Sequence, residues 1–422
     1  MNEPKRSLPA YIILAMLLGL LAGSVAEPAQ RALGVDVRAW LISLGPIGKV
    51  YIELIKMMAI PLVFMSIIDA VISTSISWRA AGRWAVIIAC NTVCALALGL
   101  TISNLFQPGR GFPMSSAQDS GAAAAMVVQP PSVVKALEGV VPSSIVEPFA
   151  ENNVLSVVFL SLLVGAALRR HLQLHAKGAH DAQRLTQGVL SVWTIALMWL
   201  VHVVPLAVFC VTARTVAEHG LAPFAQLAQY VALGVAGMLL QICLVYPLWI
   251  RLVARLSLRR FWEAAKKPIV CAFGTNSSLA TVPLTLNALD SLGVSKSASR
   301  LGTCIGTNFN NDGILLYEAM AVLFVAQAYG VELSLGQQVM AAVMSLVAAV
   351  GVAGVPEAGV VSLSLVLTAV GLPLDILPLL LTVDWIVARM RSVTNVLSDM
   401  TVSAAIDGLG GASTAGSPGK TD

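Results

Sequence analysis

The chain has 422 residues, of which 57% are hydrophobic and only 11% are charged. Soluble domains carry about 25% charged residues, so this composition predicts a polytopic membrane protein. The net charge of +4 does not indicate a nucleic-acid partner, because the basic residues gather at the ends of apolar segments. The six cysteines lie singly inside apolar segments without CxxC or CxxH spacing, which argues against a disulfide framework or a zinc site.

The first 255 residues contain six apolar segments, each long enough or nearly long enough to cross a membrane at about 20 residues per span. The first segment follows Lys5 and Arg6 as a signal peptide would, but the later spans favour a first transmembrane helix. The Gly-, Pro- and Ser-rich stretch 107–150 is predicted to be an external loop. The predicted spans are 9–26, 46–73, 85–106, 152–168, 188–213 and 224–254.

Basic residues in the short connections predict the orientation of these spans. The positive-inside rule places the side with more Lys and Arg in the cytoplasm. It therefore predicts a cytoplasmic N-terminus, and we expect a bacterial inner-membrane protein, surrounded by lipid, with its C-terminus also cytoplasmic. The cations on this side are Lys5, Arg6, Arg79, Arg83, Arg169, Arg170, Lys177, Arg184, Arg251, Arg255, Arg259, Arg260, Lys266 and Lys267.

The pattern changes after residue 256, where two apolar segments are interrupted by small and turn-forming residues. The segment 260–294 is interrupted at 274–278, and the segment 334–373 at 351–359. Each half is too short to span, so both segments are predicted to be re-entrant hairpins. Hairpin-plus-helix units that enter from opposite faces form an inverted repeat around a transporter's binding site. The prediction is an all-α polytopic membrane protein with eight transmembrane helices and two re-entrant hairpins.

This change of pattern divides the chain into two parts, residues 1–255 with the regular spans and residues 256–407 with the interrupted segments. The second part contains the hairpin 260–294, the broken helix 299–327, the hairpin 334–373 and the helix 375–407. The Gly-, Ser- and Thr-rich tail 408–422 is expected to be disordered.

The broken helix contains the most polar stretch of any predicted span, Gly306-Thr-Asn-Phe-Asn-Asn-Asp-Gly313. An ionised Asp at the centre of a membrane helix costs about 2.5–3.5 kcal/mol. Each unpaired backbone amide in hydrocarbon costs several kcal/mol more. Such a cluster indicates a helix that breaks in mid-membrane, where freed carbonyls and side-chain oxygens hold a small hard cation.

The last predicted helix carries Asp384, Arg391, Ser392, Asn395 and Asp399 on one face. The guanidinium group of the arginine suits a carboxylate bidentately, so it is either a substrate anchor or half of a structural ion pair. The residue pattern alone leaves both open.

Other polar residues also allow two interpretations. Asp312, Asn310, Asn395 and Asp399 offer hard oxygen ligands suited to Na⁺, or form a hydrogen-bonded packing network. Ser277 and Ser278 either bind an anion at a hairpin tip or only stabilise the turn. Glu318 is a proton carrier, or a static partner of Arg389.

Several motifs closely resemble those of the dicarboxylate/amino acid:cation symporters. The resemblance runs from Leu54-Ile-Lys-Met-Met-Ala-Ile-Pro61 to Asp399. Its most specific parts are Thr275-Asn-Ser-Ser278, Asn310-Asn-Asp-Gly313 with Leu316-Tyr-Glu318, Ala353-Gly-Val-Pro-Glu-Ala-Gly359, and Val383-Asp-Trp385 leading to Arg391 and Asn395-Val-Leu-Ser-Asp399.

The resemblance implies a homotrimer whose transport domains move like elevators against a rigid scaffold, with the hairpin that ends at Gly359 as a gate. On this resemblance, residues 1–255 are expected to be mainly scaffold and trimerisation helices, with the span 85–106 contributing to a transport core of residues 256–407. The resemblance also implies three sodium sites. The first has Gly306, Asn310, Asn395 and Asp399; the second has Asn310, Asp312, Asn91 and Thr92; the third uses backbone carbonyls near Asn308, Ala349, Val350 and Val352.

The substrate site departs from the family pattern. Ala388 stands where amino-acid transporters of the family carry an Asp for the substrate's amine, and Ile314 replaces a Thr. An ammonium group buried without an ionic partner is expensive, which favours a substrate without an α-amino group, such as a dicarboxylate. Glu357 offers an alternative partner for an amine. The implied substrate-site residues are Asn276, Ser277, Ser278, Asn311, Ile314, Val355, Glu357, Ala358, Gly359, Ala388, Arg391, Ser392 and Asn395.

We therefore expect a secondary active symporter, not an enzyme, that couples Na⁺ to the uptake of a small carboxylate. Glu318 and Arg389 match charged positions of the animal glutamate transporters, which leaves an added H⁺ open. The first alternative is a Na⁺-coupled amino-acid symporter that uses Glu357. The remote alternative is an intramembrane aspartyl protease, which needs two carboxylates that share a proton. A passive anion conductance is a further activity that the family combines with transport.

Overall fold

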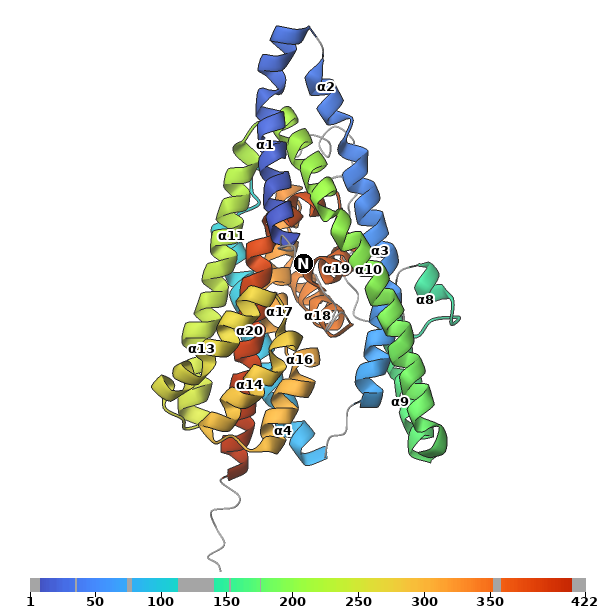
Figure 1. The fold of residues 1–422 in the computed structure, drawn as a ribbon, viewed down its shortest axis with the longest axis vertical. Helices are drawn as coiled ribbons and strands as arrows, with labels where there is room; N and C mark the ends of the chain where they lie inside the picture. Colours follow the sequence, from blue (N-terminus) through green and yellow to red (C-terminus); the bar gives the residue numbers. More distant parts are fainter. Residues whose placement is uncertain are drawn as a thin grey trace, which may run out of the picture. The chain divides into compact units, whose positions relative to one another are not determined.

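A computed structural model describes residues 8–34, 36–73, 78–112, 140–151, 153–174, 176–351 and 358–411, and these contain helices and no strand (Figure 1). They fall into two compact units, to each of which several separate stretches of the chain contribute. The first unit comprises Met1–Ile72, Ser103–Leu233 and Glu318–Val387, and the second comprises Ser73–Ile102, Gly234–Tyr317 and Ala388–Asp422. Most of the loop predicted at 107–150, the tail beyond 411, and Val352, Val355 and Glu357 lie outside the described residues.

Five stretches of helix in the described residues are long and apolar enough to cross a membrane: Val37–Ile72, Gly82–Phe106, Ser156–Leu174, Asp181–His219 and Ala222–Val253. They coincide with five of the six spans predicted in the first 255 residues. The remaining predicted span, 9–26, is shorter than these five, since the apolar part of the first helix covers only Ala10–Ala26. The seventh and eighth predicted spans are the broken helix and the polar last helix, so the total of eight stays a prediction.

In the first unit, α1 (Leu8–Leu33) packs along α10 (Ala176–His219), the longest described helix. Two glycines one turn apart permit the close approach, as in the small-residue interfaces of membrane helices. A Cβ atom added to Gly19 would lie 2.8 Å from Thr212 Cβ, and one added to Gly23 would lie 2.5 Å from Val216 Cβ. The α1–α10 contact therefore requires glycine at both positions.

The other helices of the first unit include a packed pair, α18 with α19, which corresponds to the second predicted hairpin. Asn104 and Gln338 exchange hydrogen bonds between their side-chain amides (2.8 and 3.3 Å), which ties the end of α4 to α18. The remaining bounds are α2 Val37–Ile42, α3 Gly45–Ser73, α8 Glu147–Ala150, α9 Val154–Leu174, α18 Leu335–Gly351 and α19 Ala358–Ala369.

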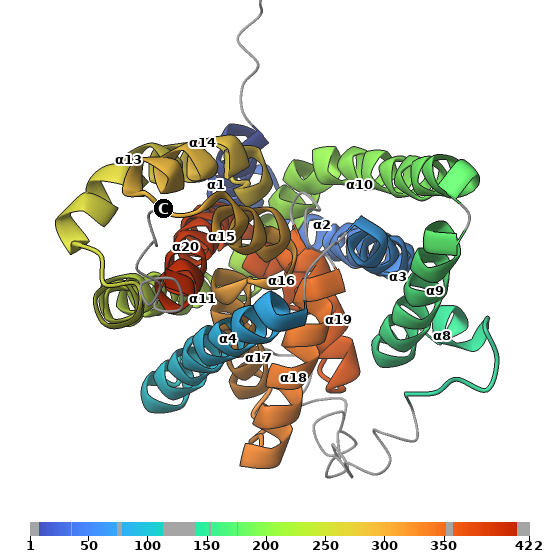
Figure 2. The ribbon, with the colours of Figure 1, turned by 90° about the horizontal axis from the view of Figure 1, so that it is seen from below.

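In the second unit, α13 (Leu258–Thr275) and α14 (Ser278–Leu292) pack side by side and correspond to the first predicted hairpin (Figure 2). Their apolar faces join a core that includes Phe261, Leu289 and Met400. Whether either helix pair enters and leaves the membrane on one side stays a prediction. The short elements of this unit are η1 Gln241–Val245, α12 Tyr246–Leu248, η2 Trp249–Val253, α15 Lys296–Arg300, η3 Leu301–Ile305 and α16 Gly306–Phe309.

Besides α3, whose last residue Ser73 belongs to the second unit, four described helices contribute residues to both units. The last of them, α20, runs to Gly411, past the predicted end at residue 407, because Gly408 lets it pack on the end of η2. A Cβ atom at Gly408 would lie 2.5 Å from the carbonyl oxygen of Val253. The four helices are α4 Trp78–Phe106, α11 Ala222–Leu240, α17 Asp312–Ala328 and α20 Leu377–Gly411.

The α1–α10 contact makes a testable prediction. Gly23→Ala should lower the free energy of unfolding by about 1–3 kcal/mol, because the new methyl group overpacks against α10. Gly188→Ala in α10 is the matched control, since nothing lies within 4 Å of its added Cβ. That variant should be neutral, or more stable by roughly 0.5–1 kcal/mol. Thermal unfolding in detergent compares the two variants. Equal shifts in their melting temperatures would contradict the assigned contact.

A candidate cation and carboxylate site

The broken helix ends and restarts at Asn310–Asn311. Asn310 leaves the helical conformation (φ −106°, ψ 75°) at the end of α16, and α17 begins at Asp312. The first amides of a helix lack partners within it, and here the side chain of Asn395 supplies one. Its Oδ1 accepts a hydrogen bond of 2.8 Å from the backbone N–H of Gly313. A Cβ atom at Gly313 would lie 2.6 Å from the carbonyl oxygen of Arg391, so α17 and α20 meet closely here.

One carboxylate of the site belongs to Asp399, which is 1% exposed. It accepts hydrogen bonds from Thr307 Oγ1 (3.0 Å) and Asn310 Nδ2 (3.1 Å). Gly306 permits this approach, because a Cβ atom there would lie 2.9 Å from Asp399 Oδ1. All these donors are neutral, so they do not cancel the negative charge.

A second carboxylate belongs to Asp312, which is fully buried. Its Oδ2 accepts hydrogen bonds from Ser398 Oγ (2.6 Å) and Tyr246 OH (3.1 Å), and Gln241 Nε2 lies 3.5 Å away. Gln241 also donates to the backbone oxygen of Asn91 (3.4 Å), which joins α4 to this cluster. Within the described part of the chain, neither Asp312 nor Asp399 takes part in a salt bridge.

Three buried oxygens of this region have no hydrogen-bond partner among the described residues. They are Asp312 Oδ1, Asn91 Oδ1 and Thr92 Oγ1. An unsatisfied buried acceptor costs about 1–3 kcal/mol, and a charged one costs more. A cation bound to these oxygens would remove that cost. Hard oxygen donors with one carboxylate suit a monovalent hard cation, because one charge balances one charge.

Arg391 is 4% exposed, and its guanidinium carbon lies 4.3 Å from the centre of the Tyr317 ring. This cation–π contact fixes the plane of the guanidinium group and with it the direction of its fork of donors. Three other predicted substrate residues, Asn311, Ile314 and Ala388, are buried in the same unit. Asn311 Oδ1 accepts a hydrogen bond of 3.3 Å from Asn395 Nδ2.

The turn between α13 and α14 is attached to α20. Ser392 Oγ donates to Asn276 Oδ1 at 3.0 Å, and Asn276 adopts the left-handed conformation (φ 51°) that ends α13. Ser277 caps α14, since its Oγ accepts from the backbone N–H of Ala280 at 3.1 Å. Ser277 therefore serves the turn, and Ser278 is the first residue of α14.

Several predicted site residues lie elsewhere. Ala349, Val350, Ala358 and Gly359 belong to α18 and α19 in the first unit. Val352, Val355, Glu357 and the side chain of Asn308 are outside the described residues. Glu318 lies buried in the first unit, where its Oε1 accepts a hydrogen bond from Ser362 Oγ of α19, and half-buried Arg389 belongs to the second unit.

Four residues without a predicted role contact the two carboxylates: Gln241, Tyr246, Thr307 and Ser398. Gln241 was detectable, because it is a polar residue inside the apolar span 224–254. It opens the π-helical segment η1, a departure from regular helix that is often found at functional sites.

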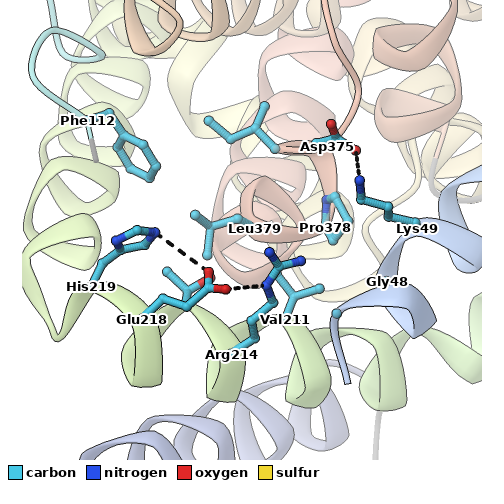
Figure 3. A pocket seen from close by; sticks show the side chains of 13 residues that line it. Gly48, Lys49, Phe112, Val211, Arg214, Glu218, His219, Asp375, Pro378 and Leu379 are labelled. Atoms are coloured by element: carbon cyan, nitrogen blue, oxygen red, sulfur yellow. Dashed lines mark hydrogen bonds and ion pairs between the residues drawn. The ribbon is translucent and has the colours of Figure 1, made fainter. Parts of the chain in front are cut away.

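A separate cavity of about 140 Å³ lies in the first unit, between the start of α3, the end of α10 and the start of α20 (Figure 3). Arg214 and His219 both point toward Glu218 (3.0 and 3.7 Å), and Lys49 pairs with Asp375 at 3.3 Å. It contains none of the predicted site residues. Its charges are paired and partly exposed, so we place the site at the buried carboxylates instead.

The chain is similar to a known family along nearly its whole length. The model of the "Sodium:dicarboxylate symporter family" matches residues 8–409. A relative from Ralstonia nicotianae named C4-dicarboxylate transport protein 3 is 32% identical over 94% of this chain and 88% of its own length. The proton/glutamate-aspartate symporter of Escherichia coli is 29% identical over 94% and 92%. The proton/sodium-glutamate symport protein of Bacillus caldotenax is 27% identical over 94% and 92%.

The hydroxyl group of Tyr246 provides a test of the Asp312 cluster. Tyr246→Phe should lower the free energy of unfolding by about 1.5 kcal/mol, because a hydrogen bond to a charged acceptor is lost. Tyr329→Phe is the control, since the buried hydroxyl of Tyr329 has no hydrogen-bond partner among the described residues. We would measure thermal unfolding in detergent without added ligand. If both variants have the same melting temperature as the parent, the hydrogen bond from Tyr246 does not stabilise the cluster.

Proposed function

We propose that this chain, which belongs to the sodium:dicarboxylate symporter family, couples Na⁺ to the uptake of a small carboxylate that lacks an α-amino group. The observation that carries the proposal is the pair of buried carboxylates, Asp312 and Asp399, each without a salt bridge among the described residues. A C4 dicarboxylate is the first candidate substrate, in keeping with the name of the relative that is 32% identical.

Family membership makes the chain an integral membrane transporter rather than an enzyme. The aspartyl-protease alternative is therefore rejected. The relatives named above are bacterial, which supports the proposal of a bacterial inner-membrane protein. The cytoplasmic position of both termini is proposed from the distribution of Lys and Arg in the sequence.

We propose two cation sites in the second unit. The first uses Asp312, Asn310, Asn91 and Thr92, where three unpaired oxygens support it. The second uses Gly306, Asn310, Asn395 and Asp399, where Asn310 Nδ2 donates to the Asp399 carboxylate at the end of α16 and Asn395 Oδ1 accepts from Gly313 just after the break. A third, built on carbonyls near Asn308, Ala349, Val350 and Val352, is proposed from the family resemblance alone. Na⁺ would supply the positive charge that each buried carboxylate needs.

Arg391 is proposed as the anchor of the substrate carboxylate. A guanidinium group held against an aromatic ring presents its N–H donors in one plane, which suits bidentate binding of a carboxylate. Ala388 lies three residues before Arg391 in α20, is 2% exposed and offers no charge to an ammonium group. Desolvation of an unpaired ammonium group costs several kcal/mol, so the site selects acids without an amine.

Coupling then follows from charge balance. A transport core with two uncompensated carboxylates crosses the apolar membrane interior only at high cost, and cations remove that cost. Asn395 links the cation site to the substrate site, because it bonds Gly313 at the break and lies one helical turn after Arg391. We propose the movement as an elevator-type displacement within a homotrimer, with α18 and α19 as the gate.

The experiment that tests the substrate assignment is ligand-dependent thermal stabilisation of the purified parent and of Ala388→Asp. Ligand at 100 times its Kd stabilises the folded state by about 2.7 kcal/mol. In NaCl, succinate or malate should stabilise the parent and aspartate should not. The same acids in choline chloride should have no effect. Ala388→Asp should bind aspartate at least tenfold more tightly, about 1.4 kcal/mol, because the amine gains a carboxylate partner.

Equal aspartate binding by parent and variant would contradict the role of Ala388. If amino acids stabilise the parent, the amine is recognised elsewhere. Loss of amine-substrate binding in Glu357→Gln, with Na⁺ binding intact, would then support the amino-acid alternative, in line with the names of the glutamate-transporting relatives.

Added proton coupling makes a separate prediction at Glu318. A buried carboxylate that accepts a hydrogen bond from Ser362 exists in charged or protonated form, and cycling between the two would carry a proton. Glu318→Gln mimics the protonated form and should flatten the pH dependence of uptake in proteoliposomes. Ser364→Ala is the control, because that buried hydroxyl of α19 bonds only its own helix backbone. An unchanged pH profile in Glu318→Gln would rule out the proton role.

A further inference from the structure

Ser398 lies at the centre of the Asp312 cluster and is fully buried. Its Oγ stands 2.6 Å from Asp312 Oδ2 and 3.1 Å from Asn310 Oδ1, and the amide Nδ2 of Asn91 lies 3.5 Å away. Its neighbours therefore come from α4, from the break after α16 and from α17, and two of them are oxygens of residues proposed to hold a cation.

Three other buried hydroxyls of α20 behave differently. Thr394, Thr401 and Ser403 each donate to the backbone carbonyl four residues earlier in the same helix, at 2.7–2.8 Å. This local bond is the usual solution for a hydroxyl inside a helix. The hydroxyl of Ser398 is instead directed at side-chain oxygens of other elements.

The hydroxyl of Ser398 has one proton but two oxygen neighbours within hydrogen-bond distance. If the proton goes to Asp312 Oδ2, the contact with Asn310 Oδ1 is between two oxygen lone pairs. The amide of Asn310 is oriented by its own Nδ2, which donates to Asp399, so Oδ1 faces Ser398. A positive centre shared by these oxygens would make both contacts favourable.

We propose that Ser398 Oγ is a ligand of the cation held by Asp312 and Asn310, an inference that rests on the proposed Na⁺ coupling. Without the cation the hydroxyl donates to Asp312, and with it the hydroxyl turns its lone pairs to the ion. Cations of this size bind oxygens at about 2.3–2.6 Å, which places neighbouring ligand oxygens roughly 3 Å apart. The separations of 2.6 and 3.1 Å around Ser398 fit such a shell. The hydroxyl thereby adds a neutral ligand without adding charge.

The test is a Na⁺ titration of thermal stability for the purified parent, Ser398→Ala and Ser398→Cys, with choline chloride holding ionic strength constant. Loss of a group that holds a metal ion or its ligands typically costs 10–100-fold in metal affinity. We expect both variants to need at least tenfold more Na⁺ for half-maximal stabilisation. The cysteine keeps the size of the side chain but replaces a hard oxygen with soft sulfur, so it separates ligation from packing.

Thr401→Val is the matched control, since it removes a buried hydroxyl of the same helix that bonds only its own backbone. It should lower stability at every salt concentration and leave the half-saturating Na⁺ concentration unchanged. If the Ser398 variants melt lower but keep the parent's half-saturating concentration within twofold, the hydroxyl is structural and the inference is overturned. If the parent is equally stable in NaCl and choline chloride, the proposed Na⁺ coupling itself fails.

Discussion

Two buried carboxylates, Asp312 and Asp399, form no salt bridge among the described residues, and the rest of the site depends on this constraint. The hydrogen bonds that they accept within the described part of the chain come from hydroxyls and amides, so no positive group balances them there when they are ionised. On the function proposed above, a fixed Lys or Arg partner would compete with the transported ion. The cation itself would then supply the missing positive charge, and this charge imbalance would drive its binding.

The break between α16 and α17 serves the same end. It brings backbone and amide oxygens to the depth of the carboxylates, and glycines at 306 and 313 let α20 approach without a side chain between them. Asn395 accepts a hydrogen bond from the backbone N–H of Gly313 in α17 and also donates one to Asn311. The residues proposed for the cation and for the substrate are thus joined by hydrogen bonds along α20, and on that proposal the occupancy of one site would affect the shape of the other.

Much of this arrangement could be predicted from the sequence, because polar residues in membrane segments are costly enough to mark their own positions. The break at Asn310–Asn311 and the polar face from Arg391 to Asp399 are of this kind. Gln241 is visible in the sequence as a polar residue inside the span 224–254. Its contact with Asp312, and the hydrogen bond of Tyr246 to the same carboxylate, could not be predicted, since they depend on how η1 and α12 lie against α17. The stacking of Arg391 on Tyr317 depends on side-chain rotamers, which a linear pattern does not contain.

The most direct test of Na⁺ coupling is uptake of radiolabelled succinate by the parent protein in proteoliposomes with an imposed inward Na⁺ gradient and equal pH on both sides. We predict transient accumulation above the equilibrium level, which a Na⁺ ionophore abolishes, because cations must fill the carboxylate sites before the core moves. Accumulation that follows a pH gradient and is the same with and without Na⁺ would contradict the account.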